Sequence, residues 1–393
     1  MGLIGQDVTV LGAGVAGLAA ARALALRGAH VTVLEQADAV REVGAGLQIS
    51  PNGAAVLRAL GLGAALEAAS TRAAAVELRD GPSGDLVTRL DVSGEPGGYH
   101  FAHRADLIAL LLEGARAAGV EVRLPQQIEA VDLSGPRPLW RNAQGASGEA
   151  RLLVGADGLK SRLRVALNGA ETPFFTRQVA WRALIPEQPG APAVAEVHMA
   201  PGRHLVSYPL RGGGLRNIVA VEERRTWVEE GWTLRDDTMD MKLAFAAFSP
   251  RVRGWLDQVE DVWLWGLFRH PVAARWFAVQ EGGAAVILGD AAHPTLPFLA
   301  QGASMALEDA WVLAEALAGH DRLADGLAAY EARRAARCRR IVAAANTNAR
   351  LYHLGGPLRA VAHLGLRLGG RLAPAAPLRR FDWLYRHDVT QGG

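Results

Sequence analysis

The sequence lacks the features that mark extracellular, membrane-spanning and nucleic-acid-binding proteins. Its single cysteine, Cys338, excludes a framework of internal disulfides and suits a reducing cytoplasm. No run of about 18 apolar residues is free of charge, glycine and proline, so we expect no membrane span. The N-terminus has no basic region before its apolar residues, which disfavours a signal peptide. The net charge of +2 is too small to suggest a nucleic-acid partner.

The composition is typical of a globular protein with an ample core. Of the 393 residues, 50% are hydrophobic and 21% are charged, and the length suggests two or three domains. Cys338 lies in a basic segment, ARRAARCRR, so we expect a surface thiol rather than a catalytic one. The arginines of this segment lie around a helix instead of along one face, which predicts a solvated helix that pairs with acidic neighbours. They are Arg333, Arg334, Arg337, Arg339 and Arg340.

The N-terminus has the pattern of a βαβ unit with a phosphate-binding loop. Residues 8–11 and 30–34 are predicted strands, and 16–27 a helix. Between them lies GxGxxG, in which Gly12 permits a tight turn, Gly14 lets a pyrophosphate approach the backbone, and Gly17 lets helix and strand pack closely. Glu35 ends the second strand, where a carboxylate can accept hydrogen bonds from a ribose. A lone GxGxxG also arises from helix packing, but the whole pattern predicts dinucleotide binding, with NAD and FAD both open.

A second segment, LGDAAHPTLPFLAQGASMALEDA at 288–310, complements that loop. The apolar strand 284–288 ends at Gly289 and Asp290, a proline-rich bend follows, and Gln301-Gly302 begin a helix. The strand end therefore offers a carboxylate, while the helix start offers free N–H groups and the positive end of a dipole. A ligand with hydroxyl groups and a partly anionic ring suits this combination.

Between these segments the pattern changes and then returns. Further helices are expected at 52–60 and 104–118, with strands at 120–124 and 151–154. From about 171 to 275, short alternating strands rich in tryptophan predict a separate antiparallel lobe. The α/β pattern then resumes, and a helical segment follows from about 325. The nucleotide-binding domain is therefore expected to be discontinuous in sequence.

Three further motifs, together with GxGxxG, carry a family resemblance. They are HRADL at 103–107, GADGLKS at 155–161 and the 288–310 segment. The sequence resembles the class A, single-component FAD-dependent aromatic hydroxylases, in the branch of the salicylate, 3-hydroxybenzoate and 6-hydroxynicotinate hydroxylases. The likeness also includes VGAGLQI at 43–49, Trp181-Arg182, WGLF at 265–268 and DWLY at 382–385.

The resemblance implies an α/β fold with three parts. The Rossmann-like FAD-binding domain would comprise 1–70, 96–170 and 276–325. An antiparallel β-sheet domain for the substrate would comprise 71–95 and 171–275, and a C-terminal helical region would comprise 326–393.

The same resemblance implies the FAD site. Asp290 should bind the ribityl chain, Gly302 and Ala303 should face the pyrimidine edge of the flavin, and Arg41 and Arg104 should lie near the ribityl and pyrophosphate groups. Asp157 is associated with FAD and NAD(P)H; on pattern alone, Asp157-Gly158 is only a turn after a strand. The full set of expected cofactor-binding residues is Gly12, Gly14, Ala16, Gly17, Glu35, Gln36, Arg41, Arg104, Ile128, Asp157, Asp290, Gly302 and Ala303.

The implied activity is hydroxylation of an aromatic substrate by NADH or NADPH and O₂ through a flavin C4a-hydroperoxide. A substrate bearing a carboxylate and a hydroxyl is the first expectation, with an aliphatic or polycyclic substrate as the alternative and a non-catalytic flavin-binding protein as a third. Since no second GxGxxG is present, NAD(P)H should dock transiently on a surface cleft. We expect no metal and no nucleic-acid partner, and a cytoplasmic monomer or homodimer.

His204, Tyr208 and Gln48 are the candidate catalytic residues. On a strand, His204 and Tyr208 share a face with Cα atoms about 13 Å apart. The resemblance implies that they contact a phenol or carboxylate and help to remove the phenolic proton; the alternative is a sheet-face pair satisfied by its neighbours. Gln48 stands where the 6-hydroxynicotinate branch has a histidine treated as a base. Glutamine cannot titrate, which makes that substrate less favoured and leaves Gln48 a hydrogen-bonding role.

The proline-rich bend supplies the last expectations. Pro294 and Pro297 should stiffen a loop that excludes water from the flavin. We interpret His293 as structural rather than as an acid–base group. The expected apolar pocket walls are Trp181, Phe298 and Leu299, which on pattern alone are equally typical of a core.

Overall fold

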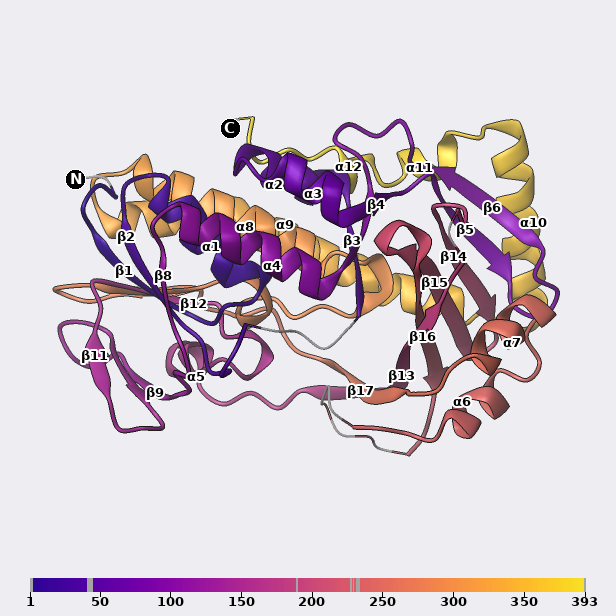
Figure 1. Ribbon diagram of the computed structural model, residues 1–393, viewed down its shortest axis with the longest axis horizontal. Coiled ribbons are helices and arrows are strands. Elements are labelled where there is room, and N and C mark those ends of the chain that lie inside the picture. Colours follow the sequence, from indigo (N-terminus) through magenta and orange to yellow (C-terminus); the bar gives the residue numbers. More distant parts are fainter. Residues whose placement is uncertain are drawn as a thin grey trace.

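The computed structural model describes residues 3–40, 45–188, 190–226, 228, 230 and 234–391. It has two lobes, each built on a large β-sheet, and helix α9 (Leu323–Tyr352) runs along both (Figure 1). Within these residues, no helix is both long and apolar enough to cross a membrane.

The first lobe contains a six-stranded sheet that is parallel except at its β18–β19 edge. Its strands, in spatial order, are β18 (Phe277–Val279), β19 (Ala284–Ile287), β12 (Leu152–Gly155), β1 (Asp7–Leu11), β2 (His30–Leu34) and β8 (Glu121–Arg123). Strands β12 and β19 are fully buried, as their unbroken apolar runs predict for a sheet covered on both faces. The predicted βαβ start and the strands before Asp157 and Asp290 are thus confirmed.

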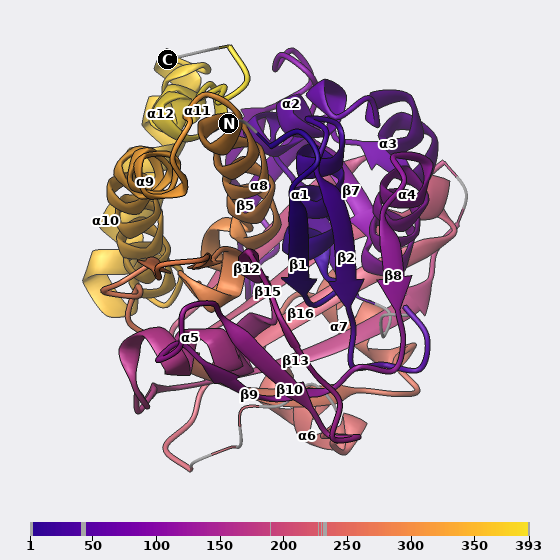
Figure 2. The same cartoon turned by 90° about the vertical axis from the view of Figure 1, so that its left-hand side faces the viewer.

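Helices and a small sheet cover this lobe. On one side, α1 packs between α8 and α4 (Figure 2). On the other side lie α5 and an antiparallel three-stranded sheet. The elements are α1 (Val15–Ala25), α4 (Arg104–Ala117), α5 (Arg162–Asn168), α8 (Gly302–Ala318), β9 (Ile128–Asp132), β10 (Leu139–Asn142) and β11 (Ser147–Glu149).

A second three-stranded sheet joins the two lobes. It consists of β3 (Gly46–Ile49), β7 (His100–His103) and β4 (Ser70–Arg72), and β7 packs against β15 (Arg203–Leu210) of the second lobe. Helices α2 (Pro51–Ala59) and α3 (Gly63–Ala69) follow β3 and pack on each other.

The second lobe is the predicted antiparallel sheet, with seven strands. Their order is β17 (Trp263–Arg269), β13 (Phe174–Pro186), β16 (Leu215–Glu223), β15 (Arg203–Leu210), β14 (Val194–Ala200), β5 (Ala75–Asp80) and β6 (Leu86–Asp91). Among these described strands, only β14 and β5 pair in parallel. Helices α6 (Thr238–Ala244) and α7 (Pro250–Asp257) enclose a core on one face of this sheet. The predicted domain boundaries themselves stay a prediction.

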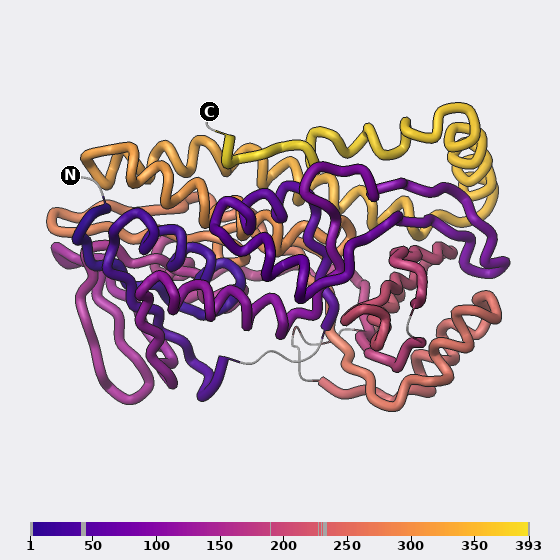
Figure 3. Tube along the Cα trace, turned by 45° about the horizontal axis from the view of Figure 1, so that its top comes forward, coloured from indigo at the N-terminus to yellow at the C-terminus, as the bar shows by residue number. Residues whose placement is uncertain are grey.

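The C-terminal segment is helical, as predicted, and returns along the molecule. After α9, helix α10 (Gly356–Leu372) packs on β6 at one end, and the chain then runs back until α12 (Asp382–Tyr385) contacts α2 (Figure 3). The short helix α11 (Ala376–Arg379) lies between them.

The basic segment of α9 corrects two sequence predictions. Cys338 and Arg334 are fully buried, because α9 packs on α8 and meets two carboxylates there. Arg334 donates to Glu308 at 2.5 Å and to Asp309 at 2.7 Å, and Arg337 bonds Glu308 with two 2.8 Å contacts. The predicted pairing with acidic neighbours is confirmed. The predicted solvation is wrong for the face of α9 that carries Arg334 and Cys338. Arg333, Arg339 and Arg340 are exposed.

Candidate functional site

One cavity of about 1200 Å³ extends from the glycine-rich loop to the seven-stranded sheet and α10. Nine of the predicted site residues line it: Gly14, Ala16, Gln48, Arg104, His204, Tyr208, Asp290, Gly302 and Ala303. The fold therefore brings together residues that the sequence separates by almost 300 positions. Gly14 and Asp290 follow strands of the parallel sheet, at the strand ends where α/β folds bind ligands, whereas His204 and Tyr208 come from the antiparallel sheet.

The glycine-rich loop forms one end of the cavity. Gly12 has φ +96°, and a Cβ there would lie 2.6 Å from the carbonyl oxygen of Ala156. On Gly17, a Cβ would lie 1.9 Å from the carbonyl oxygen of Gly12, so close helix–strand packing requires glycine. In contrast, a Cβ on Gly14 would meet none of the described heavy atoms within 4 Å. Gly14 thus borders open space at the start of α1, where a diphosphate can approach free N–H groups.

Glu35 and its neighbours lie beside the loop rather than on the cavity lining. The Glu35 carboxylate accepts hydrogen bonds from the backbone N–H groups of Ala13 at 2.7 Å and Ala37 at 2.9 Å. Gln36 is exposed, and Ile128 begins β9, half-buried against the core. Arg41 lies outside the described residues.

Asp290 presents its carboxylate to the interior of the cavity. The residue follows β19 in a short 3₁₀ turn, η3 (Gly289–Ala291), and protein surrounds it, yet its side chain is exposed to the cavity space. Removal from bulk water raises the pKa of Asp290, while His293 and Arg104 oppose the rise. Burial in turn lowers the pKa of Arg104, and Asp290 opposes that change. The two side chains therefore place opposite charges on one stretch of the cavity wall.

The start of α8 lies open to the same space. Among the described residues, no side chain caps this helix, so the N–H groups of its first turn are available to a ligand. The side chain of Gln301 is instead fixed by Ser50, because its amide donates a hydrogen bond to the Ser50 hydroxyl at 2.9 Å. Asn52 ties this group to α8 by donating to Glu308 at 2.6 Å. The helix start is thus fixed in position. Gly302 and Ala303, which form the positive end of the helix dipole, lie on the cavity lining.

Asp157 keeps one oxygen without a protein partner. Its Oδ2 accepts a hydrogen bond from the N–H of Arg162 at 2.8 Å, whereas the buried Oδ1 has no partner in the described part of the chain. Burial raises the pKa of Asp157, and the hydrogen bonds from Ser161 and Arg162 oppose the rise. Asp157 does not line the cavity, although Gly158 does. This oxygen is an acceptor that the described protein groups leave unpaired.

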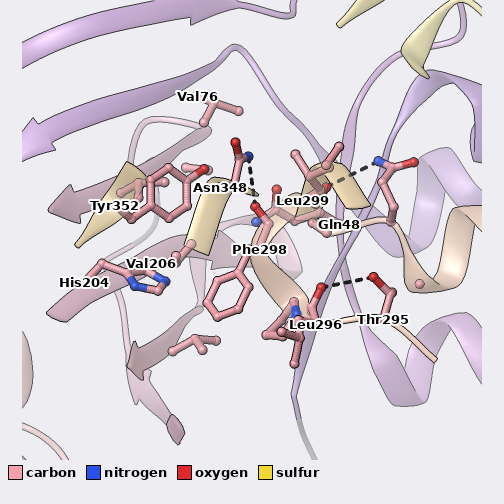
Figure 4. Close-up of a pocket in the computed structure, with 18 of the residues that line it drawn as sticks. Gln48, Val76, His204, Val206, Thr295, Leu296, Phe298, Leu299, Asn348 and Tyr352 are labelled. Carbon is pink, nitrogen blue, oxygen red and sulfur yellow. Dashed lines mark hydrogen bonds between the residues drawn. The ribbon is translucent and has the colours of Figure 1, made fainter. Parts of the chain in front are cut away.

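His204 and Tyr208 line the cavity from one face of β15, with Val206 between them, which confirms the predicted shared face. The His204 ring lies 5.5 Å from Phe298 and 5.2 Å from Tyr352, measured between centroids (Figure 4). Burial and the neighbouring His353 lower the pKa of His204 well below its usual value, so the imidazole is neutral.

Gln48 connects two buried tyrosines. Its side-chain oxygen accepts a hydrogen bond from the Tyr99 hydroxyl at 2.7 Å, and its amide hydrogen-bonds to Tyr208. Burial raises the pKa of Tyr208, while Arg182 and Gln48 oppose the rise. The contacts agree with a hydrogen-bonding role for Gln48, which orients Tyr208 instead of titrating.

Arg182 is a lining residue that sequence reasoning did not single out. It is half-buried, and its guanidinium lies 4.2 Å from the ring centroid of Trp265, which also lines the cavity. Burial lowers the pKa of Arg182 to about 10, so it is cationic at neutral pH. Strand alternation could have predicted this orientation, because neighbouring residues of a strand face opposite sides of the sheet. Trp181 packs in the core beneath α6 and α7, which leaves Arg182 on the side of the cavity. Trp181 is therefore a core residue, and the prediction of a pocket wall is wrong there.

The bend before α8 closes over the cavity. Pro294, Pro297, Phe298 and Leu299 line it as predicted, and Asn348 of α9 holds the bend by donating to the carbonyl oxygen of Phe298 at 3.3 Å (Figure 4). Asn348 and Tyr352 also line the cavity and carry no motif that the sequence would reveal. His293 points away: its Nε2 lies 2.5 Å from Asp309 Oδ2, an ion pair that agrees with a structural role.

Known proteins resemble the chain over nearly its whole length. Residues 6–345 match the protein family described as FAD binding domain. The 3-amino-4-hydroxybenzoate 2-monooxygenase PtmB3 of Streptomyces platensis is 35% identical over 98% of this chain and 97% of its own. The 3-hydroxybenzoate 6-hydroxylase of Polaromonas naphthalenivorans is 32% identical over 97% and 96%. A solved salicylate hydroxylase substrate complex shares the fold, with a TM-score of 0.81 and 23% identity over 98% of this chain and 96% of that one.

The chain therefore belongs to the FAD-binding-domain family. Within it, the chain is a monooxygenase of the class A FAD-dependent aromatic hydroxylases, which confirms the predicted family, fold class and flavin cofactor. The residues of the cavity fit FAD, because Gly14 borders open space, Asp290 offers a carboxylate to the interior, and the start of α8 is uncapped.

Proposed function

We propose that this protein hydroxylates an aromatic acid that carries a phenolic hydroxyl, using NADH or NADPH and O₂. One observation carries the proposal: a cation, Arg182, and the polar pair His204 and Tyr208 line the same apolar cavity as the FAD-binding residues. The cation of Arg182 suits a carboxylate, and the pair of His204 and Tyr208 suits a phenol. Both relatives described above have names that specify a hydroxybenzoate.

The proposed FAD site uses the ends of two helices and one carboxylate. The diphosphate lies at the start of α1 against Gly14, with Gly12, Ala16 and Gly17 shaping the loop. Asp290 accepts hydrogen bonds from ribityl hydroxyls, and Arg104 lies beside it. The remaining proposed contacts are Glu35, Gln36, Arg41, Ile128 and Asp157. When bound, FAD supplies the activation of O₂ and the transfer of one oxygen atom.

The start of α8 has an electrostatic role in this proposal. The N–H groups of Gly302 and Ala303 face the pyrimidine edge of the flavin, where negative charge gathers on reduction. A helix N-terminus favours such charge. The bend at 294–299 then excludes water from the reacting ring by covering the cavity with apolar and proline side chains.

On the substrate side, His204 takes the phenolic proton. A phenolate ring is richer in electrons than a phenol and therefore attacks an electrophilic oxygen faster. Neutral His204 can act as this base because burial disfavours its charged form before the reaction. Tyr208, oriented by Gln48, hydrogen-bonds to the substrate oxygen, and Arg182 binds the carboxylate.

NAD(P)H docks transiently in this proposal, since the sequence contains one GxGxxG and FAD occupies it. The proposed compartment is the cytoplasm, because a lone buried thiol requires no oxidising environment. The proposed assembly is a monomer or a homodimer.

The testing experiment is a screen of phenolic and N-heteroaromatic acids with the purified, FAD-loaded protein. Each compound is scored for stimulation of NADH and NADPH oxidation, followed by product analysis. We expect a hydroxybenzoate-like acid to stimulate oxidation and to gain one hydroxyl group. Protein that takes up no FAD, or that hydroxylates only compounds without an acidic hydroxyl, would overturn the proposal.

A second candidate keeps the chemistry but changes the substrate. The cavity continues along an apolar sheet face formed by Val76, Leu78, Leu90 and Val197 toward Leu366 of α10. This extension favours a larger aliphatic or polycyclic substrate over a single ring. Extended apolar compounds belong in the same screen, and their turnover in preference to the small acids would select this candidate.

A further inference from the structure

His204 is the inner end of a hydrogen-bonded chain that reaches the surface. Its Nδ1 lies 2.7 Å from Nε2 of His353, and Nδ1 of His353 lies 2.7 Å from Oε1 of Glu223. His204 and His353 are buried, whereas the Glu223 side chain is 53% exposed. Three elements supply the chain: His204 comes from β15, Glu223 ends β16, and His353 follows α9.

The outer carboxylate determines which nitrogen of each ring carries the proton. A carboxylate only accepts hydrogen bonds, so His353 must donate from Nδ1 and keep a lone pair on Nε2. That lone pair accepts from His204, which therefore carries its proton on Nδ1. His204 is left with a lone pair on Nε2, its other ring nitrogen. Glu223, the last residue of β16, thus determines the tautomer in which Nε2 of His204 can act as a base.

Gln178 makes a competing contact with His353. The side-chain nitrogen of Gln178 lies 3.4 Å from Nδ1 of His353 and would donate to it if that nitrogen held a lone pair. The Glu223 contact is 0.7 Å shorter and involves a charged acceptor, which makes it the stronger of the two. Gln178 therefore does not reverse the tautomers.

We propose that His353 and Glu223 form a proton relay that carries the substrate's phenolic proton from His204 to solvent. This inference rests on the proposed function of the cavity. His353 and Glu223 do not touch the reacting atoms in it; they act through His204.

The relay conserves protons at each step. The phenolic O–H bond breaks as an N–H bond forms on Nε2 of His204. The Nδ1 proton of His204 passes to Nε2 of His353, and the Nδ1 proton of His353 passes to Glu223, which releases it to water. After oxygen transfer, the same path run in reverse returns one proton to the oxygen of the product and restores the original tautomers.

The burial of His204 explains why it needs such a path. Burial lowers its pKa well below the usual value, so a proton gained from the substrate cannot remain on this ring. Burial also lowers the pKa of His353, although Glu223 opposes that effect. The other charged groups near the end of β16 and the start of β15, Glu222 with Arg203 and Arg224, pair with one another at 3.0 and 3.3 Å. They leave Glu223 as the acceptor that His353 faces.

The first test requires no substrate. NMR of the FAD-loaded protein with isotope-labelled histidine reports which nitrogen of each ring is protonated. We expect His204 and His353 both to be protonated on Nδ1 near neutral pH. Glu223→Gln should keep these tautomers, because an amide oxygen can still accept, whereas Glu223→Ala should release them. A His204 protonated on Nε2 in the unmodified protein would overturn the relay, whatever the substrate is.

The second test separates a relay from a merely structural contact. Glu223→Gln keeps the acceptor but cannot carry the proton as an acid, so we expect turnover to fall by about tenfold or more. Added imidazole or formate should restore part of the lost rate, while KM and FAD content remain unchanged. Glu222→Gln, one residue away, is the matched control and should leave the rate unchanged.

The two tests also distinguish failure of the relay from failure of the proposed function. An unchanged rate in Glu223→Gln, in an enzyme that hydroxylates a phenol, overturns the relay alone. Absence of phenol hydroxylation in the unmodified enzyme overturns the proposed function, and the histidine tautomers then still decide whether the hydrogen-bonded chain exists.

Discussion

Gly46 lies directly against the ring of Tyr208. A Cβ placed on Gly46 would come within 2.6 Å of Cε2 and 2.7 Å of the hydroxyl oxygen of Tyr208. The N–H of Gly46 also donates to the side chain of Asn217 at 2.8 Å, which fixes β3 against β16. Absence of a side chain at Gly46 therefore determines where the Tyr208 hydroxyl can lie in the cavity.

Gly46→Ala should consequently displace Tyr208 while leaving the FAD site intact. We expect kcat/KM for the phenolic substrate to fall by roughly tenfold to a hundredfold, since small displacements of positioning groups have effects of this size. Steady-state kinetics and flavin absorbance measure the two properties. Gly254→Ala serves as a control, because a Cβ there meets no described atom within 4 Å. Full activity in Gly46→Ala would show that the Tyr208 position does not matter.

Asp290→Asn should weaken retention of FAD. The substitution removes the charge that faces the cavity and halves the acceptor capacity for ribityl hydroxyls, and a lost charged hydrogen bond corresponds to about 1.5–3 kcal/mol. The dissociation constant for FAD, measured by flavin fluorescence on titration into the apoprotein, should rise by roughly tenfold or more. Glu281→Gln, at an exposed position before the same strand, should leave it unchanged. Equal affinities would refute the ribityl assignment.

Gly14 and Gly17 should respond differently to alanine. Gly17→Ala forces a Cβ to 1.9 Å from the carbonyl oxygen of Gly12, so we expect the free energy of unfolding to fall by about 1–3 kcal/mol. Gly14→Ala has open space and an ordinary φ of −76°, so the fold should be unaffected. The new methyl group would instead meet the diphosphate and weaken FAD binding. Urea unfolding and FAD titration of both variants check the contrast, which equal behaviour would contradict.

Sequence patterns predicted much of this structure because the relevant physics is local. The strand, glycine turn and helix at residues 7–25 follow from apolar periodicity and from the steric freedom of Gly12. The shared face of His204 and Tyr208 follows from strand alternation. Family resemblance then connected Asp290 to the distant glycine-rich loop, which no local pattern does.

What the sequence did not reveal depends on packing between distant segments. Arg334 and Cys338 lie in a basic run whose solvation could only be judged by knowing that α9 covers α8. The importance of His353 becomes visible only in the fold, where the residue after α9 lies beside Glu223 at the end of β16. Arg182 was visible as part of a motif, but its orientation into the cavity follows from the register of β13.

Arg334→Met should strongly destabilise the protein. Arg334 is fully buried and neutralises Glu308 and Asp309, so its removal leaves excess negative charge in the core. We expect the free energy of unfolding to fall by about 3–5 kcal/mol, the usual effect of breaking a buried ion pair from one side. Urea unfolding at saturating FAD measures it, with the exposed Arg339→Met as control. A difference below about 1 kcal/mol from the control would contradict the inferred importance of this network.

Acid should destabilise the fold through the same carboxylates. Burial alone would raise the pKa of both carboxylates. For Glu308, Arg334 and Arg337 outweigh burial and lower the pKa from the ordinary 4.5 to about 2. For Asp309, His293 and Arg334 lower it from the ordinary 3.8 to about 2. The ionised carboxylates therefore stabilise the fold fully above about pH 4.5, and this stabilisation is lost as the pH falls toward 2. His293 acts in the opposite sense: burial would lower its pKa, but Asp309 raises it well above the usual value, so its stabilisation is lost only as the pH rises through that raised value.

The free energy of unfolding, measured by urea unfolding at saturating FAD from pH 7 downward, should therefore decrease most steeply between about pH 4.5 and 2. Glu308→Gln cannot titrate at this position and should reduce the slope in that range, at a lower stability overall. The exposed Glu281→Gln should keep the unmodified profile. A profile for Glu308→Gln with an undiminished acid slope would mean that other carboxylates control acid unfolding.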